Sequence, residues 1–164
     1  MELQWPLILF TTFVAWSAGL FGAQGAAALA GEGRRAQMPA LIGSAALLAV
    51  GGVAVLFHLE HFERIFNGFG NPTSGITQEL VCVVVVGALM VVAFVVLRRA
   101  AGGDGAPALP KWLAALMIAA AALLVLVTGH SYMMAARPAW DSPLGPLTLL
   151  GAACAAGPLP FAVI

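Results

Sequence analysis

The chain alternates between long apolar runs and short breaks that are polar or rich in Gly and Pro. Five apolar runs stand out, at about residues 5–30, 39–60, 76–98, 111–135 and 146–164. Each is close to the roughly 20 residues that a helix needs to cross the hydrocarbon core of a bilayer. Backbone amides inside hydrocarbon must be hydrogen-bonded within the protein, and runs of this length fit helices better than barrel strands. The pattern predicts an all-α integral membrane protein, a bundle of about five transmembrane helices forming a single domain over residues 1–164.

The composition also indicates that the surface of the protein faces mainly lipid. Hydrophobic residues make up 62% of the 164 residues and charged residues 9%, whereas a soluble domain typically carries about 25% charged residues. The net charge is +0, so no broad basic face indicates a nucleic-acid partner. Cys82 and Cys154 are too few for an iron–sulfur cluster, which takes about four thiolates.

The Lys and Arg residues favour one orientation in the membrane. The loops after the second and fourth runs hold one Arg each, while the loops after the first and third runs hold most of the others. The latter are Arg34, Arg35, Arg98, Arg99 and Lys111. Because Lys and Arg concentrate in cytoplasmic loops, we expect the N-terminus and the loop after the second run to face the extracytoplasmic side.

Small residues recur along the first run at four-residue spacing. They are Ala15, Gly19, Ala23 and Ala27, with Gly22 and Ala26 beside them. Small residues at this spacing let two membrane helices approach closely. They predict a packing surface and imply no chemistry.

Side chains capable of chemistry gather at the predicted outer membrane surface. The set is His58, His61, Glu79, His130, Tyr132 and Trp140. The second and fourth runs cross the membrane in the same direction, and the third returns between them. The ends of the second and fourth runs and the start of the third are therefore expected at one level.

The segment Phe57–Phe66 holds several of the charged groups and does not require one shared role. Glu60 and Arg64 have the spacing of a surface ion pair on a helix. His61 and Glu63 fit solvent-exposed positions beside the loop. His58 lies deepest, directly after an apolar stretch, and is the strongest functional candidate of this segment.

Glu79 and Tyr132 each have a structural explanation beside a functional one. A carboxylate in the first turn of a helix is stabilised by the helix dipole, and aromatic anchors are common at the membrane interface. As a functional pair, however, an imidazole and a carboxylate at the lipid–water boundary suit the oxidation of a quinol. The imidazole of His58 can take a proton from the quinol hydroxyl, and Glu79 can relay protons to water.

Two motifs in order resemble a known family. His58, Leu59, Arg64, Phe66 and Asn67 match a pattern of the DmsC family, and Ser74–Glu79 match its S-x-(L/I)-(S/T)-x-E. The opening "WPLILFT", the "GPL" at residues 157–159, and Tyr132, Trp140 and Pro143 fall near further family positions. The chain thus resembles the membrane anchor subunit of dimethyl sulfoxide reductase-type molybdoenzymes over nearly its whole length.

The resemblance implies a bacterial inner-membrane subunit of an oxidoreductase complex in anaerobic respiration. Such subunits anchor a ferredoxin-like iron–sulfur subunit and a molybdopterin catalytic subunit. They oxidise menaquinol and pass its electrons to the iron–sulfur subunit, with no haem, iron–sulfur cluster or other metal of their own. The family's essential His falls on His58 and its acidic partner on Glu79, as catalytic residues. Arg64 and Tyr132 complete the implied quinol-binding set.

The sequence also departs from the family pattern. Glu60, His61, Phe62 and Glu63 replace a stretch that is usually less charged, and His130 stands where a relative can have Arg. Family members usually have about eight helices, and five are expected in this chain.

Two other classes of protein remain open at this point. A haem-binding cytochrome b-type anchor would use His58 and His130 as axial ligands from two helices. A passive anchor would bind partner subunits without quinone chemistry. A transporter is disfavoured, because transporters place polar groups near the midplane of the membrane. The middle parts of the helices here are expected to be bare of polar groups.

Overall fold

The structure, a computed structural model, describes residues 4–57, 70–101, 108–133, 135–136, 138 and 140–163. Its helices are α1 (Trp5–Ala30), the 3₁₀ turn η1 (Arg34–Ala36), α2 (Gln37–Leu56), α3 (Gly75–Ala100), α4 (Lys111–Ser131), α5 (Leu144–Ala156) and α6 (Pro158–Val163). No strand occurs among these residues, and five helical stretches are long and apolar enough to cross a membrane, with α5 and α6 together forming the fifth. The all-α fold is confirmed, and the chain is a multi-pass membrane protein.

The helix ends differ from the predicted ones where the backbone hydrogen bonding changes. The second helix was expected to reach residue 60 but ends at Leu56, and residues 58–60 lie outside the described ranges. The fourth was expected to reach residue 135 and ends at Ser131, because the Met133 N–H donates to the His130 carbonyl in a tighter closing turn. The fifth is interrupted at Gly157, since Pro158 has no N–H to donate.

A tight connection turns α1 back into α2. Gly31 has a φ of 80° and Gly33 a φ of 63°, a left-handed conformation that glycine adopts without a steric penalty. The Glu32 N–H donates to the Ala27 carbonyl, which satisfies one of the free carbonyls at the end of α1. The two helices therefore form an antiparallel hairpin.

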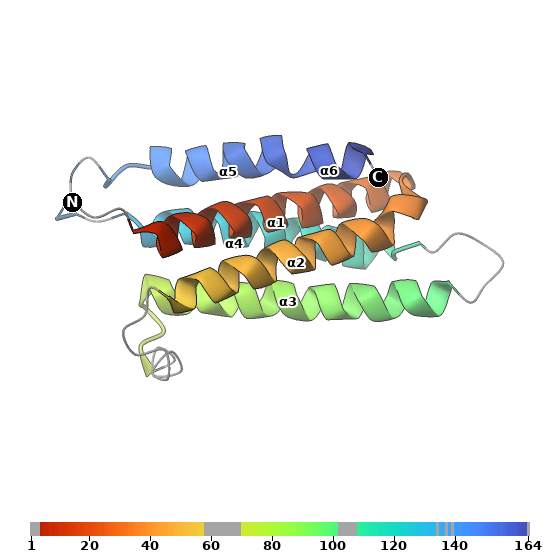
Figure 1. Ribbon diagram of the computed structural model, residues 1–164, viewed down its shortest axis with the longest axis horizontal. Coiled ribbons are helices and arrows are strands. Elements are labelled where there is room, and N and C mark those ends of the chain that lie inside the picture. Colours follow the sequence, from red (N-terminus) through yellow and green to blue (C-terminus); the bar gives the residue numbers. More distant parts are fainter. Residues whose placement is uncertain are drawn as a thin grey trace.

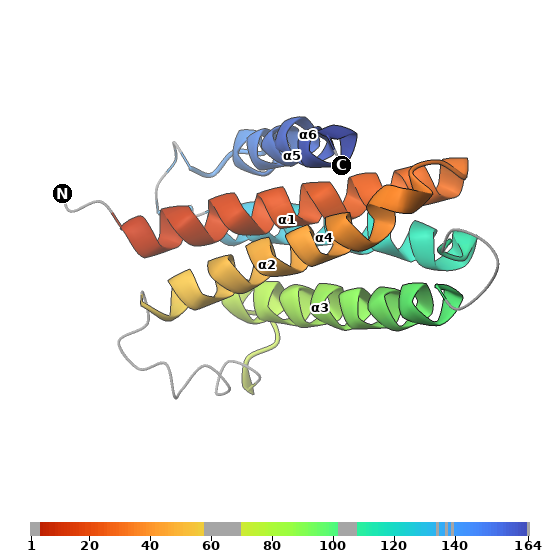
Figure 2. The same cartoon turned by 45° about the vertical axis from the view of Figure 1, so that its right-hand side comes forward.

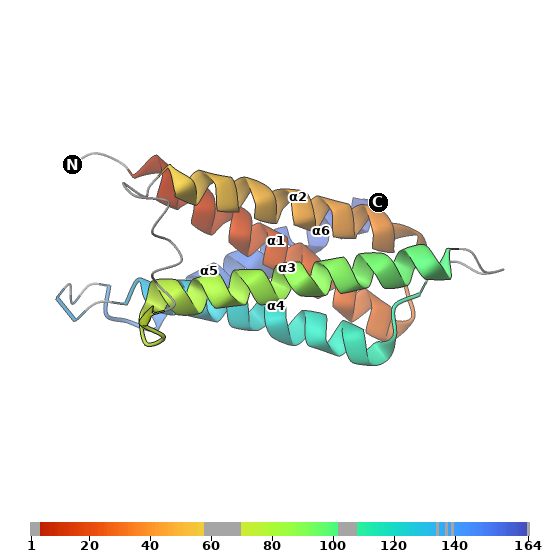
Figure 3. The same ribbon diagram turned by 90° about the horizontal axis from the view of Figure 1, so that it is seen from below.

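Helix α1 occupies the centre of the bundle. It packs against α2, α4, α5 and α6, while α3 packs mainly against α4. Figure 1 shows α5 and α6 along one side of α1 and α3 on the opposite side of the molecule, and Figure 3 shows α3 and α4 side by side.

The two ends of the bundle differ in their side chains. The "tyrosine end" holds the start of α1, the end of α2, the start of α3 and the end of α4, with Tyr132 directly after α4. The "arginine end" holds the η1 turn, the end of α3 and the start of α4. Its basic residues are Arg34, Arg35, Arg98, Arg99 and Lys111. Among the described residues, Glu79, His130, Tyr132 and Trp140 thus lie at the opposite end from the basic residues, as the sequence predicted.

Glycines allow α1 to approach its neighbours to backbone distance. A Cβ on Gly19 would overlap the Ala153 carbonyl oxygen and would lie 3.1 Å from the Gly157 Cα. A Cβ on Gly25 would lie 2.8 Å from the Ala114 carbonyl oxygen of α4. Close packing through the small residues of α1 is therefore confirmed at Gly19, whereas Ala26 of the same predicted surface is exposed.

Buried polar side chains join α1 to α2. The Ser17 hydroxyl donates to the Ser44 carbonyl at 2.7 Å, and the Gln24 amide donates to the Gln37 carbonyl at 2.9 Å. All four side chains are almost completely buried. The expectation of bare helix interiors is wrong here, because hydroxyl and amide groups are tolerated in hydrocarbon when they bond to a neighbouring helix.

We predict that Gly19→Leu weakens the bundle. The added side chain has to displace the backbone of α5 or α6, and overpacking of this kind costs about 1–3 kcal/mol. Thermal unfolding of the purified protein in detergent, followed by circular dichroism, measures the loss.

Gly151→Leu is the matched control, because Gly151 lies on α5 with no atom within 4 Å of an added Cβ. Equal unfolding temperatures for the two variants would contradict the close approach of α1 to α5 and α6.

Candidate functional site

The structure describes only part of the predicted site. His58 and Arg64, together with Glu60, His61 and Glu63, lie outside the described residues. Their assigned roles stay predictions. Glu79, His130, Tyr132 and Trp140 are described, and all four lie at the tyrosine end.

Glu79 is a buried carboxylate at the start of a membrane-spanning helix. Its side chain is 8% exposed, and its Oε1 has no hydrogen-bond partner among the described residues. Because α3 begins at Gly75, Glu79 is the fifth residue of the helix and lies beyond the first turn. The effect of the helix dipole falls off within that turn, so the dipole does not account for this buried carboxylate.

The start of α3 packs closely against the end of α4. A Cβ on Gly75 would lie 3.1 Å from the Ser131 Cβ. This contact brings Glu79 to the side of α4 that carries Thr128 and Tyr132, two residues four positions apart and so on one face of the chain.

Thr128 is a polar neighbour of Glu79 on α4. The Thr128 side chain is 0% exposed, and its hydroxyl lies within interaction range of the Glu79 carboxyl. Neither Thr128 Oγ1 nor Glu79 Oε1 makes a hydrogen bond within the described part of the chain. Two buried polar atoms without partners are costly, and they form a polar spot that a ligand or water can satisfy.

Tyr132 lies just beyond the last residue of α4 and is half-buried. Burial raises the pKa of its phenol, and the negative charge of Glu79 raises that pKa further. The Tyr132 hydroxyl therefore stays protonated throughout the physiological range and remains a hydrogen-bond donor. The structure thus brings together Glu79 and Tyr132, as the sequence predicted.

A hollow of about 260 Å³ opens beside Tyr132, between the end of α4 and the start of α5. Its lining residues are Gly129, Tyr132, Trp140, Ser142, Leu144 and Gly145. The volume is close to the lower end of ligand pockets, at roughly 300 Å³. Aromatic and small side chains around a phenol donor are suited to a planar ring with a polar oxygen.

His130 is exposed and points away from this polar spot. It follows Thr128 by two residues, which is about 200° around a helix, and Thr128 is fully buried. In the described ranges no group of three or more His, Cys, Asp or Glu side chains is placed to hold a metal ion.

Thr128 was missed in the sequence analysis. The available signal was a hydroxyl four residues before Tyr132 in an otherwise apolar helix. A single Thr in an apolar run most often bonds to its own helix, so only the packing of α3 against α4 identifies Thr128 as a neighbour of Glu79.

No family model, no curated protein and no solved structure matches the chain.

We predict that Tyr132 titrates above its ordinary pKa of 10.0 in the folded protein. It is the only tyrosine of the chain, so the absorbance change of tyrosinate near 295 nm reports this residue alone. Removing the Glu79 charge in Glu79→Gln is expected to lower the pH midpoint of the Tyr132 titration. Burial of the phenol keeps this midpoint above that of the unfolded chain.

Glu32→Gln is the matched control, since Glu32 is exposed beyond the other end of α1. An identical midpoint in Glu79→Gln and in the wild-type protein would contradict the proximity of Glu79 to Tyr132. The raised pKa means that the folded protein favours the neutral form of the Tyr132 phenol. The stability that this preference contributes to the fold is complete below pH 10 and is lost as the pH rises toward the folded-state pKa.

Proposed function

We propose that the protein is the membrane anchor and quinol-oxidising subunit of a dimethyl sulfoxide reductase-like complex, as its resemblance to the DmsC family implies. The observation that supports this function most directly is the buried Glu79 carboxyl beside Thr128 and Tyr132, at one end of a multi-pass bundle. A quinol site needs this combination, because the ring partitions into lipid while its protons must reach water.

The described residues suit separate tasks in the oxidation of menaquinol. The protonated Tyr132 hydroxyl donates a hydrogen bond to a ring oxygen, and the hollow beside it accepts the ring. Glu79 accepts a proton and passes it toward the water at the tyrosine end. Thr128 orients the Glu79 carboxyl and is a positioning residue.

The remaining roles fall on residues known from the sequence alone. His58 takes the proton of the quinol hydroxyl, and Arg64 supports the ring from the loop after α2. Menaquinol thereby becomes menaquinone by releasing two protons to water and two electrons. The electrons pass singly to the nearest cluster of a partner iron–sulfur subunit, which delivers them to a molybdopterin catalytic subunit.

The distribution of basic residues supports an orientation for this proposal. The arginine end faces the cytoplasm of a bacterial cell, because Lys and Arg concentrate on that side of the plasma membrane. The N-terminus and the quinol site then face the extracytoplasmic side, and protons from menaquinol are released there.

We predict that Glu79→Gln slows quinol oxidation about 10²–10⁴-fold, the usual contribution of a general acid–base group. The amide keeps the size of the side chain but cannot accept a proton. The measurement is the oxidation rate of a menaquinol analogue by membranes containing the whole complex, with an external oxidant for the catalytic subunit.

Glu32→Gln removes a carboxylate at the other end of α1 and is expected to keep the wild-type rate. A wild-type rate in Glu79→Gln would rule out this site. Mass spectrometry of the copurifying subunits tests the partners separately, since an iron–sulfur and a molybdopterin subunit are expected.

We also predict that the purified protein shows no Soret band. The exposed position of His130 gives a haem at that side chain little protein to bury it. An absorption spectrum with a Soret band that disappears in His130→Ala would favour the cytochrome b-type anchor instead.

A further inference from the structure

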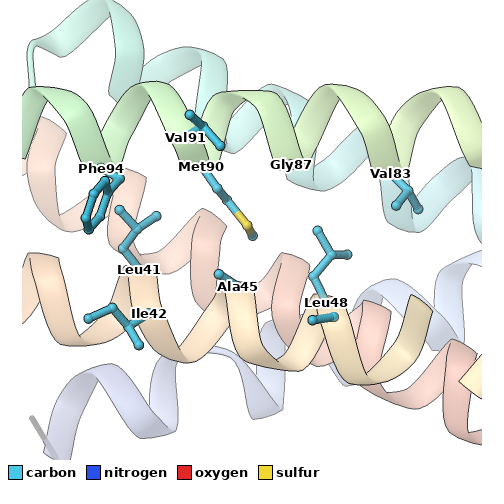
Figure 4. Close-up of a pocket in the computed structure, with 10 residues that line it drawn as sticks. Leu41, Ile42, Ala45, Leu48, Val83, Gly87, Met90, Val91 and Phe94 are labelled. Carbon is cyan, nitrogen blue, oxygen red and sulfur yellow. The ribbon is translucent and has the colours of Figure 1, made fainter. Parts of the chain in front are cut away.

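An apolar groove of about 480 Å³ runs between α2 and α3 within the membrane-spanning part of the bundle. Its lining residues, shown in Figure 4, are Leu41, Ile42, Ala45, Leu48, Ala49, Val83, Gly87, Met90, Val91 and Phe94. None of these side chains carries a polar group, so the groove fits a hydrocarbon chain and offers nothing to a polar ligand.

The groove exists because α2 and α3 have different main partners. Helix α2 packs chiefly against α1 and α3 chiefly against α4. Figures 1 and 2 show that α2 crosses α3 obliquely and does not run parallel to it. The space between them is filled only partly, and Gly87 leaves it wider, since no atom lies within 4 Å of an added Cβ there.

Positive charge lies at the arginine end of this groove. Phe94 lines the groove, and the Arg98 guanidinium lies 5.9 Å from the centre of its ring. Arg98 follows Phe94 by four residues and so continues the same face of α3. Arg34 and Arg35 are exposed in the η1 turn directly before α2, on the other side of the groove.

We propose that the groove and these arginines bind one anionic phospholipid from the leaflet at the arginine end. An acyl chain lies along Val83, Gly87 and Phe94, and the phosphate lies near Arg98 and the η1 turn. Basic residues beside a gap between membrane helices are a recognised arrangement for anionic headgroups. A neutral lipid would fill the same groove but would leave the arginines without a counter-charge.

This site is separate from the proposed quinol site. Its charged mouth lies at the arginine end, whereas Glu79 and Tyr132 lie at the tyrosine end. The lipid proposal therefore does not depend on the proposed function.

Native mass spectrometry of the purified protein tests the proposal. The protein is titrated with phosphatidylglycerol or phosphatidylcholine that carry the same acyl chains. Because each Lys or Arg near a lipid surface contributes on the order of a fivefold gain in affinity for an anionic lipid, we expect phosphatidylglycerol to bind at least about fivefold more tightly.

Two pairs of variants separate the groove from the charge. Gly87→Leu places a side chain in the groove at a position where an added Cβ meets no atom within 4 Å, and it is expected to weaken phosphatidylglycerol binding at least about tenfold. Gly151→Leu on α5 is expected to leave this binding unchanged. Arg98→Gln is expected to weaken phosphatidylglycerol binding about fivefold with phosphatidylcholine binding unchanged. Arg99→Gln, which changes the next residue on another face of α3, keeps the preference.

Equal affinity of the wild-type protein for the two lipids would overturn the proposal. So would wild-type phosphatidylglycerol binding in Gly87→Leu. A copurifying neutral quinone that is lost in Gly87→Leu, with phosphatidylglycerol binding unchanged, would assign the groove to the quinone instead.

Discussion

The close approach of α1 to its neighbours is the contact on which the bundle depends. Lipid tails are as apolar as the side chains of these helices, so association rests on van der Waals packing and on hydrogen bonds between helices. Gly19 packs closely against α5 and Gly157, and Gly25 packs closely against α4. The buried Ser17 and Gln24 side chains donate hydrogen bonds to α2. Since α1 touches four other helices, these residues fix the positions of most of the chain.

The position of the candidate site depends on this arrangement indirectly, through α4. Helix α4 is held against α1, and α3 is held against α4 through the contact of Gly75 with Ser131. That contact buries Glu79 beside Thr128 and within electrostatic range of Tyr132. A carboxylate on the lipid-facing side of α3 would be an exposed charge near the interface, whereas Glu79 is buried between helices, as the proposed role in proton transfer requires.

The two ends of the bundle have different physical characters. The tyrosine end holds a buried carboxylate, a phenol and a small hollow, which suit chemistry on a ring with polar oxygens. The arginine end holds exposed guanidinium groups beside an apolar groove, which suit a charged headgroup with a hydrocarbon tail. Each end thus combines polar or charged side chains with a neighbouring hollow or groove.

Much of the architecture could be predicted from the order of the residues. The five spans, their alternating direction and the gathering of Glu79 and Tyr132 at one end follow from the hydrophobic pattern, because hydrocarbon imposes helices of a set length. The exact helix ends could not be predicted from the hydrophobic pattern. An apolar run does not reveal the closing turn at His130 or the interruption at Gly157.

Only the tertiary structure decided which faces of the helices meet. The role of Thr128 as a neighbour of Glu79, the bonds of Gln24 and Ser17 to α2, and the groove beside Gly87 depend on the rotation of each helix about its axis. In a segment that is apolar on all sides, hydropathy carries no information about that rotation. It is set by close contacts between small residues that lie far apart in the sequence.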